Sequence, residues 1–158
     1  MPYRWIVYLH VFSAFLFIGI HGVSMAVLYA VRADVDRKRV EALMRFSAWT
    51  VAPMYVALAM VAGTGLWMGF EVNGWFSQSW YWLALSLLVV ITALMWFVAR
   101  PFGKRILAAC QIRPSGVPRR SDEELAQILG SNRTHVITAI GVVGFAIILG
   151  LMIFRPDF

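Results

Sequence analysis

Two histidines in one apolar segment are the residues best suited to chemistry in this chain. His10 and His21 lie 11 residues apart within "WIVYLHVFSAFLFIGIHGVSM". Eleven residues make about three turns of an α-helix, so the spacing predicts both imidazoles on one face, about 16 Å apart along the axis. One metal ion or one heme iron cannot bind both at that distance. If both are ligands, they belong to two separate sites.

Methionines supply candidate partners for His10. When each apolar segment is centred in a bilayer and counted at about 1.5 Å per residue, Met68 and Met152 fall at the level of His10. Neutral imidazole binds heme iron and copper, and the thioether sulfur is a soft ligand. Ligation of one metal by His10 and a methionine is therefore one hypothesis for this level of the bilayer.

The same count gives His21 its own set of candidates. Met54 and Met95 fall at its level, and His135, the third histidine, lies about 9 Å further toward the inner side. A heme held between His21 and His135 needs tilted or offset helices. His135 on its own is expected to be an interfacial residue beside Arg133.

Structural roles compete with ligand roles for all of these side chains. Each imidazole can hydrogen-bond a neighbouring helix through Ser, Thr or a backbone carbonyl, and methionines at helical spacing commonly fill a core. Ionisable residues inside membrane segments are nevertheless rare and are often functional. Both interpretations stay open at this point.

The elements that carry these residues are predicted to be membrane-spanning helices. The chain has 158 residues and is 61% apolar, above the 45–50% or so of soluble domains. Four apolar runs, at about 5–30, 48–70, 79–99 and 135–154, reach the roughly 20 residues that a spanning helix needs. We therefore predict one all-α domain over 1–158, an up-and-down four-helix bundle in contact with the lipid bilayer.

Charge predicts the orientation of this bundle. Lys and Arg gather in two of the three connections, within 32–45 and 100–133, whereas the connection "FEVNGWFSQSW" has none. Because such an excess marks the cytoplasmic side, both termini are predicted outside, in the periplasm of a bacterial inner membrane. The net charge of +6 is thereby explained by topology, and a nucleic-acid partner is not expected. The first segment is too long for a signal-peptide core and is expected to remain as a helix.

Shorter features fill the long inner connection. Ser121 and Glu124 have the spacing of a capping box, which predicts a short amphipathic helix at about 122–129, lying at the inner membrane surface. Cys110 is expected in the basic loop after the third span. As the single cysteine, it cannot form an internal disulfide.

Several stretches carry a family resemblance. "YRWIVYLHVFSAFLFIG", "MRFSAWTVAPMYVALAMVAGTGLW" and "LMIFRPDF" resemble the HemJ-type protoporphyrinogen oxidases and the related copper-resistance D-type membrane proteins, with this chain in a separate branch. The resemblance implies a four-span fold, heme b and an oxidoreductase of porphyrinogens. His10 matches the first-span histidine of that family, and Pro53, Met54, Gly63 and Gly65 fit its second-span pattern.

Departures from the family pattern argue against the enzymatic reaction. Val7 stands where the HemJ-type proteins have a lysine, and residues 79–99 contain no lysine. "SNRTHVIT" replaces the family's entry to the last span. The predicted spans also lack a base or cation for the propionates of a porphyrin substrate.

Three functions follow as hypotheses. The first is a small heme b protein that transfers electrons, within a larger respiratory or heme-handling assembly. The second is copper handling through histidine and methionine. The third is a non-catalytic subunit or assembly factor of a membrane complex, with other subunits or further copies of itself as partners.

Overall fold

The computed structural model describes residues 2–34 and 36–157, and these residues are predominantly helical. The elements in chain order are α1 (Pro2–Ala30), the 3-10 turn η1 (Val31–Ala33), α2 (Arg37–Glu71), the 3-10 turn η2 (Trp75–Ser77), α3 (Ser79–Cys110), α4 (Asp122–Gly130) and α5 (Arg133–Phe154). Four helical segments are long and apolar enough to cross a membrane, which confirms the prediction of a helical chain with four candidate spans.

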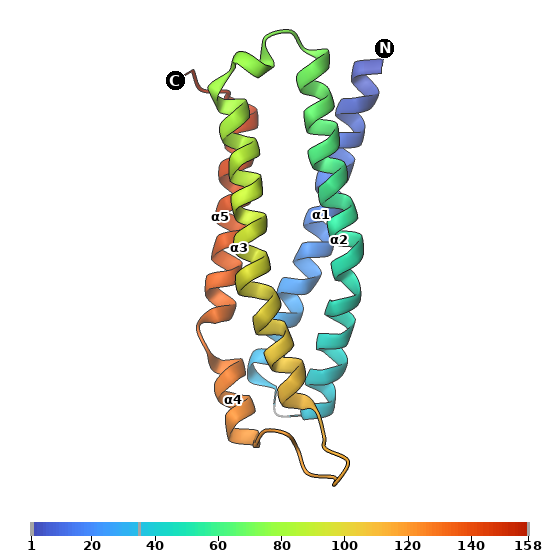
Figure 1. Cartoon of the computed structure of the whole chain (residues 1–158), viewed down its shortest axis with the longest axis vertical. Helices are drawn as coiled ribbons and strands as arrows, with labels where there is room; N and C mark the ends of the chain where they lie inside the picture. The colour runs from blue at the N-terminus through green and yellow to red at the C-terminus, as the bar shows by residue number, and fades with distance from the viewer. Residues whose placement is uncertain (1, 35, 158) are drawn as a thin grey trace.

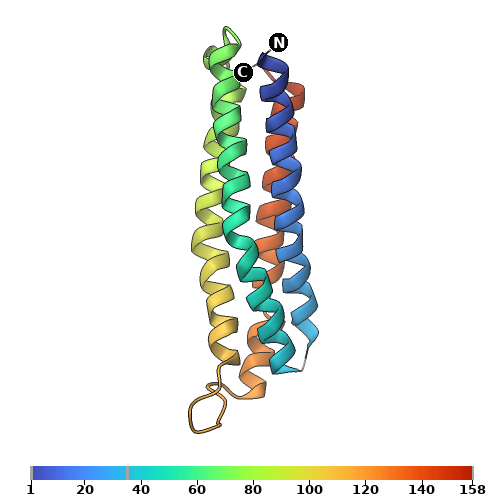
Figure 2. The ribbon, with the colours of Figure 1, turned by 90° about the vertical axis from the view of Figure 1, so that its right-hand side faces the viewer.

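The four long helices stand side by side and alternate in direction. Both termini lie at one end of the bundle together with the α2–α3 connection, while α4 lies at the opposite end (Figures 1 and 2). We call these the terminal end and the α4 end. Helix α1 packs mainly on α2, and α3 packs mainly on α5. The histidines on α1 are therefore positioned chiefly by α2.

Helix α2 begins well before its apolar run. Asp36 caps it by accepting hydrogen bonds from the backbone N–H groups of Lys38 (2.9 Å) and Arg39 (3.5 Å). The helix then continues through Pro53 to Glu71. A side-chain oxygen at the N-cap satisfies N–H groups that have no partner inside the helix. The amphipathic start of α2 thus joins the span without a break.

Helix α3 is longer than the predicted span, and Cys110 is not in a loop. The helix passes Arg100 and Pro101 and ends at Cys110, which is fully buried. Phe102 and Ile106 repeat the burial at helical spacing, and this periodic apolar face keeps the segment helical beyond the first charge. These residues belong to the main core, whose buried members are Val27, Val31, Val40, Met44, Phe102, Ile106, Ala109, Cys110, Leu125, Leu129 and Ile137.

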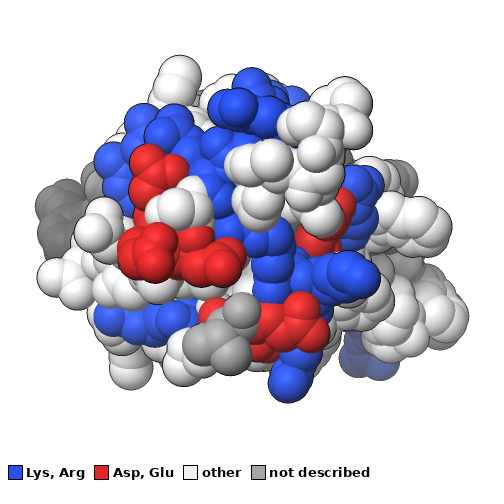
Figure 3. All heavy atoms as spheres, turned by 90° about the horizontal axis from the view of Figure 1, so that it is seen from below, with Lys and Arg blue, Asp and Glu red and all other residues white. Residues whose placement is uncertain are grey.

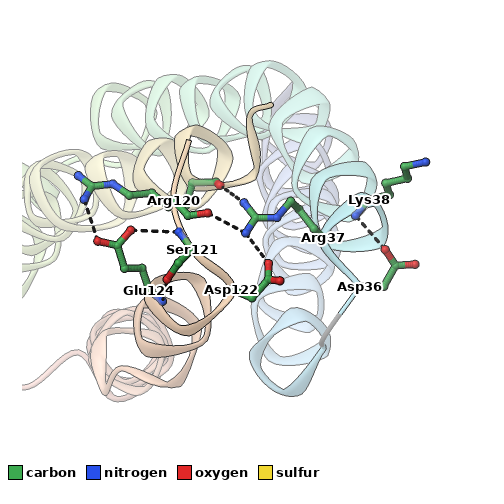
Figure 4. Close-up of polar contacts among 8 residues, drawn as sticks. Asp36, Arg37, Lys38, Arg120, Ser121, Asp122 and Glu124 are labelled. Atoms are coloured by element: carbon green, nitrogen blue, oxygen red, sulfur yellow. Dashed lines mark hydrogen bonds and ion pairs between the residues drawn. The ribbon is translucent and has the colours of Figure 1, made fainter. Parts of the chain in front are cut away.

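Helix α4 closes this end of the bundle. Ser121 and Glu124 form the capping box, and Leu125 and Leu129 are buried in the main core. Arg37 joins three segments, because its guanidinium donates to the carbonyls of Ala109 and Arg120 and to the carboxylate of Asp122 (Figure 4). The α4 end is thus held by an apolar core and by a half-buried arginine.

The terminal end is held by an aromatic side chain in a glycine notch. The Tyr81 hydroxyl donates to the carbonyl of Gly65 at 3.2 Å. A Cβ at Gly69 would stand 2.5 Å from that hydroxyl oxygen and 3.0 Å from Phe76. A side chain at residue 69 therefore has no room, and glycine allows α3 to approach α2.

Candidate functional site

Both span-one histidines bond to α2. His10 Nδ1 lies 2.9 Å from Thr64 Oγ1, and His21 Nδ1 lies 3.5 Å from Met54 Sδ. The prediction that the two imidazoles share one face of α1 is confirmed by these contacts to a common neighbour. Their partners differ in chemistry, since one is a hydroxyl and the other a thioether.

The hydrogen bonds around Thr64 fix the orientation of the His10 ring. Thr64 has one hydroxyl hydrogen, which it donates to the carbonyl of Met60 at 2.6 Å. With that hydrogen directed to the carbonyl, the oxygen accepts from the His10 tautomer whose Nδ1 carries the proton. In that tautomer Nε2 is unprotonated and is the nitrogen that would bind a metal.

The His10 ring lies against Gly65 of α2. A Cβ at Gly65 would lie 3.4 Å from His10 Cε1, at the short end of ordinary contact. The methionines predicted at this level are not hydrogen-bonded to the ring in the described part of the chain. Met68 is buried four residues beyond Thr64, and Met152 contributes its carbonyl to Arg155. His10 is thus paired with a threonine of the neighbouring helix, as the structural alternative expected, although the sequence did not single out Thr64.

His21 lies where all four long helices meet. Met54 of α2 contacts its Nδ1, and Phe17 of α1 stacks on the ring with centroids 5.5 Å apart and planes inclined by 11°. A Cβ at Gly141 of α5 would lie 3.0 Å from His21 Nε2 and also 3.0 Å from Met95 Cε of α3. The predicted grouping of His21 with Met54 and Met95 is therefore present.

This cluster has the donor set of a soft-metal site. It offers one imidazole and two thioethers from three different helices, and Gly141 leaves room beside them. In the described residues no group of three or more His, Cys, Asp or Glu side chains could hold a metal ion. A hard cation would find no carboxylate cage at this position, whereas copper(I) prefers the sulfur and imidazole ligands that are present.

His135 takes no part in either cluster. It is exposed at the start of α5, and its Nδ1 lies 3.0 Å from the Tyr29 hydroxyl. The two rings also touch, with centroids 5.6 Å apart. This contact ties α1 to α5 near the α4 end, in agreement with the interfacial role expected for His135.

His21, Met54 and Met95 line one cavity of about 220 Å³ in the half of the bundle nearer α4. Arg100 and Lys104 of α3 line the same cavity. Both side chains lie on α3 beyond residues 79–99, the predicted span, which itself contains no cation. The length of α3 thus brings two cations to the cavity from outside the predicted span.

Comparisons with protein-family models, with curated proteins and with solved structures find no match to this chain.

Proposed function

We propose that this protein binds copper(I) within the membrane, at His21, Met54 and Met95, and that its role is copper handling. The observation that carries the proposal is the 3.5 Å separation of His21 Nδ1 and Met54 Sδ. Met95 lines the same cavity as these two residues. Imidazole and thioether are neutral donors, and soft donors of this kind select copper(I) over harder ions.

The separation of the two donors suits a shared ion. A d10 ion such as zinc binds nitrogen at about 2.0 Å and sulfur at about 2.3 Å, and tetrahedral ligands at those lengths are about 3.5 Å apart. His21 Nδ1 and Met54 Sδ already stand at that distance. Without an ion, the same two atoms make a weak N–H···S contact. Copper(I) could therefore bind after the side chains of His21 and Met54 rotate, and the helices would not need to move.

Anaerobic titration of the purified protein with copper(I), in competition with a chromophoric chelator, tests this proposal. We expect one copper per chain, with nitrogen and sulfur ligands by X-ray absorption. His21→Ala should abolish stoichiometric binding, and Met54→Leu or Met95→Leu should each weaken it about tenfold or more. Met60→Leu is the matched control, because the Met60 side chain lies on the same helix α2 but is exposed and does not line the cavity.

Leucine and methionine have similar volumes, so these substitutions change the donor atom with little effect on packing. A wild-type protein that binds no copper(I) would overturn the proposal. Equal affinities for the Met54→Leu, Met95→Leu and Met60→Leu variants would overturn it as well.

Heme b at His10 is the second candidate, and the Thr64 contact favours it. A histidine that ligates iron usually donates its other ring nitrogen to a neighbouring acceptor, as His10 Nδ1 donates to Thr64. The HemJ-type resemblance points to the same histidine. In this case the protein would transfer electrons through heme b.

The absorbance spectrum, oxidised and dithionite-reduced, tests the second candidate. A reduced b-type α-band that is lost in His10→Ala and retained in His21→Ala would support it. A colourless protein from cells supplied with heme precursors would refute it. The copper titration is unaffected by this outcome, since the two histidines are about 16 Å apart along α1.

The orientation proposed for the bundle follows the charge. Lys and Arg cover much of the α4 end, with Asp and Glu between them (Figure 3). By the rule that positive charge stays on the cytoplasmic side, the α4 end faces the cytoplasm and both termini face the periplasm of a bacterial inner membrane. Helix α4 would then lie at the inner membrane surface.

A further inference from the structure

The cavity at the α4 end opens sideways between two helices. Ala48 and Val51 of α2, and Arg100 and Lys104 of α3, line the cavity and are also exposed on the surface of the bundle. These four residues form its mouth. Since α2 and α3 are spanning helices, the mouth faces the lipid leaflet at the α4 end and not the aqueous phase alone.

The two cations at the mouth have no acidic partner. The four ion pairs in the described part of the chain involve other residues. Arg100 instead stacks on Trp96, with its guanidinium carbon 3.9 Å from the ring centroid. Arg100 and Lys104 are four residues apart on α3, so they are neighbours on one helical face. A pair of unneutralised cations beside lipid is complementary to an anion.

Behind these cations the cavity is narrow and mostly apolar. Small residues, Ala99 and Gly103, line it next to the mouth, and Met44 and Leu107 lie further in. The cavity has a volume of about 220 Å³. Its apolar lining suits a flexible hydrocarbon chain that enters at the mouth.

We infer that this cavity binds one anionic phospholipid of the leaflet at the α4 end, with its phosphate on Arg100 and Lys104 and the start of an acyl chain in the cavity. Basic pockets between spanning helices are known to hold anionic headgroups, and a tryptophan at the same level marks the interface. The inference does not depend on copper. A phosphate at the mouth would also neutralise the positive charge near the His21 cluster.

Native mass spectrometry of the detergent-purified protein, with phosphatidylglycerol or phosphatidylcholine added, tests the headgroup. We expect one phosphatidylglycerol per chain, bound at least tenfold more tightly than phosphatidylcholine. The double variant Arg100→Gln/Lys104→Gln should lose this preference. The charge-matched control Arg105→Gln/Arg113→Gln should keep it, since both arginines are exposed and lie outside the cavity lining.

A second pair of variants tests the position of the acyl chain. Val51→Trp narrows the mouth without changing charge and should weaken phosphatidylglycerol binding about tenfold. Val90→Trp, at an exposed site on α3 away from the cavity, should leave it unchanged. Equal binding of the two lipids, equal losses in the two charge variants, or an unchanged affinity in Val51→Trp would each overturn the inference.

Discussion

The notch between Gly69 and Tyr81 allows a quantitative test of how α2 and α3 are joined. In Gly69→Ala the new methyl group would lie 2.5 Å from the Tyr81 hydroxyl oxygen and 2.9 Å from Cζ. Tyr81 has little room to retreat, because its ring packs edge-to-face against Phe76 at 5.5 Å. Movement of the ring would also break its hydrogen bond to the Gly65 carbonyl.

Gly63→Ala is the matched control for this change. A Cβ at Gly63 meets nothing within 4 Å, and both glycines lie in α2, so the gain in helix propensity is common to the two variants. The difference that remains is overpacking of about 1–3 kcal/mol and a lost hydrogen bond of about 1 kcal/mol. Gly69→Ala should therefore be about 2–4 kcal/mol less stable than Gly63→Ala.

Thermal unfolding in mild detergent, followed by circular dichroism, measures this difference. One kcal/mol moves the Tm of a chain of this length by about 2–4 °C, so we expect a gap of about 5–15 °C. Tyr81→Phe removes the atom nearest to the new methyl group. The cost of Gly69→Ala should accordingly be smaller in the Tyr81→Phe background than in the wild type. Equal Tm values for Gly69→Ala and Gly63→Ala would refute the close packing described for this notch.

Three further predictions concern copper(I) affinity, the hydrogen bonds of Arg37 and the orientation of the bundle. Gly141→Ala should lower copper(I) affinity about 10–100-fold in the chelator competition, because its methyl group displaces a ligand side chain; Gly150→Ala, in open space on the same helix, should leave the affinity unchanged. Arg37→Lys should lower the free energy of unfolding by about 1–3 kcal/mol, because a single ammonium nitrogen cannot reproduce the planar fork by which two guanidinium nitrogens reach three acceptors; the same change at exposed Arg39 should cost less than about 1 kcal/mol. Topology reporters fused to either terminus should report a periplasmic location, and a cytoplasmic signal from both would refute the orientation.

Counting residues predicted the level of the His21 cluster correctly because the spans run nearly alongside one another. The same count failed at His10 by one helical turn. Its partner Thr64 precedes Met68 by four residues, about 6 Å along α2. Depth along the bilayer can be counted from the sequence, but the rotation of a helix about its axis and its vertical offset depend on packing. The His10–Thr64 contact, which reports both, is visible only in the structure.

The extent of α3 was mispredicted for a different reason. The first charged residue after an apolar run marks where the lipid core ends, and it does not mark where the helix ends. Arg100 can stack on Trp96 and Lys104 can reach the interface while the opposite face of α3 stays apolar as far as Cys110. The cations at the cavity mouth and the burial of Cys110 both follow from that continuation.

The two histidines of α1 therefore have different chemical capacities, although their spacing places them on one face. The Thr64 hydroxyl hydrogen-bonds Nδ1 of His10 and orients the imidazole ring, so Nε2 is the nitrogen left for a ligand. Met54 is a polarisable thioether on a flexible side chain, and with Met95 it gives His21 partners that could turn toward an ion. Oriented nitrogen suits a rigid group such as heme, whereas an adaptable cluster of nitrogen and sulfur suits copper(I). The residues that contact each histidine from the neighbouring helices therefore distinguish the heme proposal for His10 from the copper(I) proposal for His21.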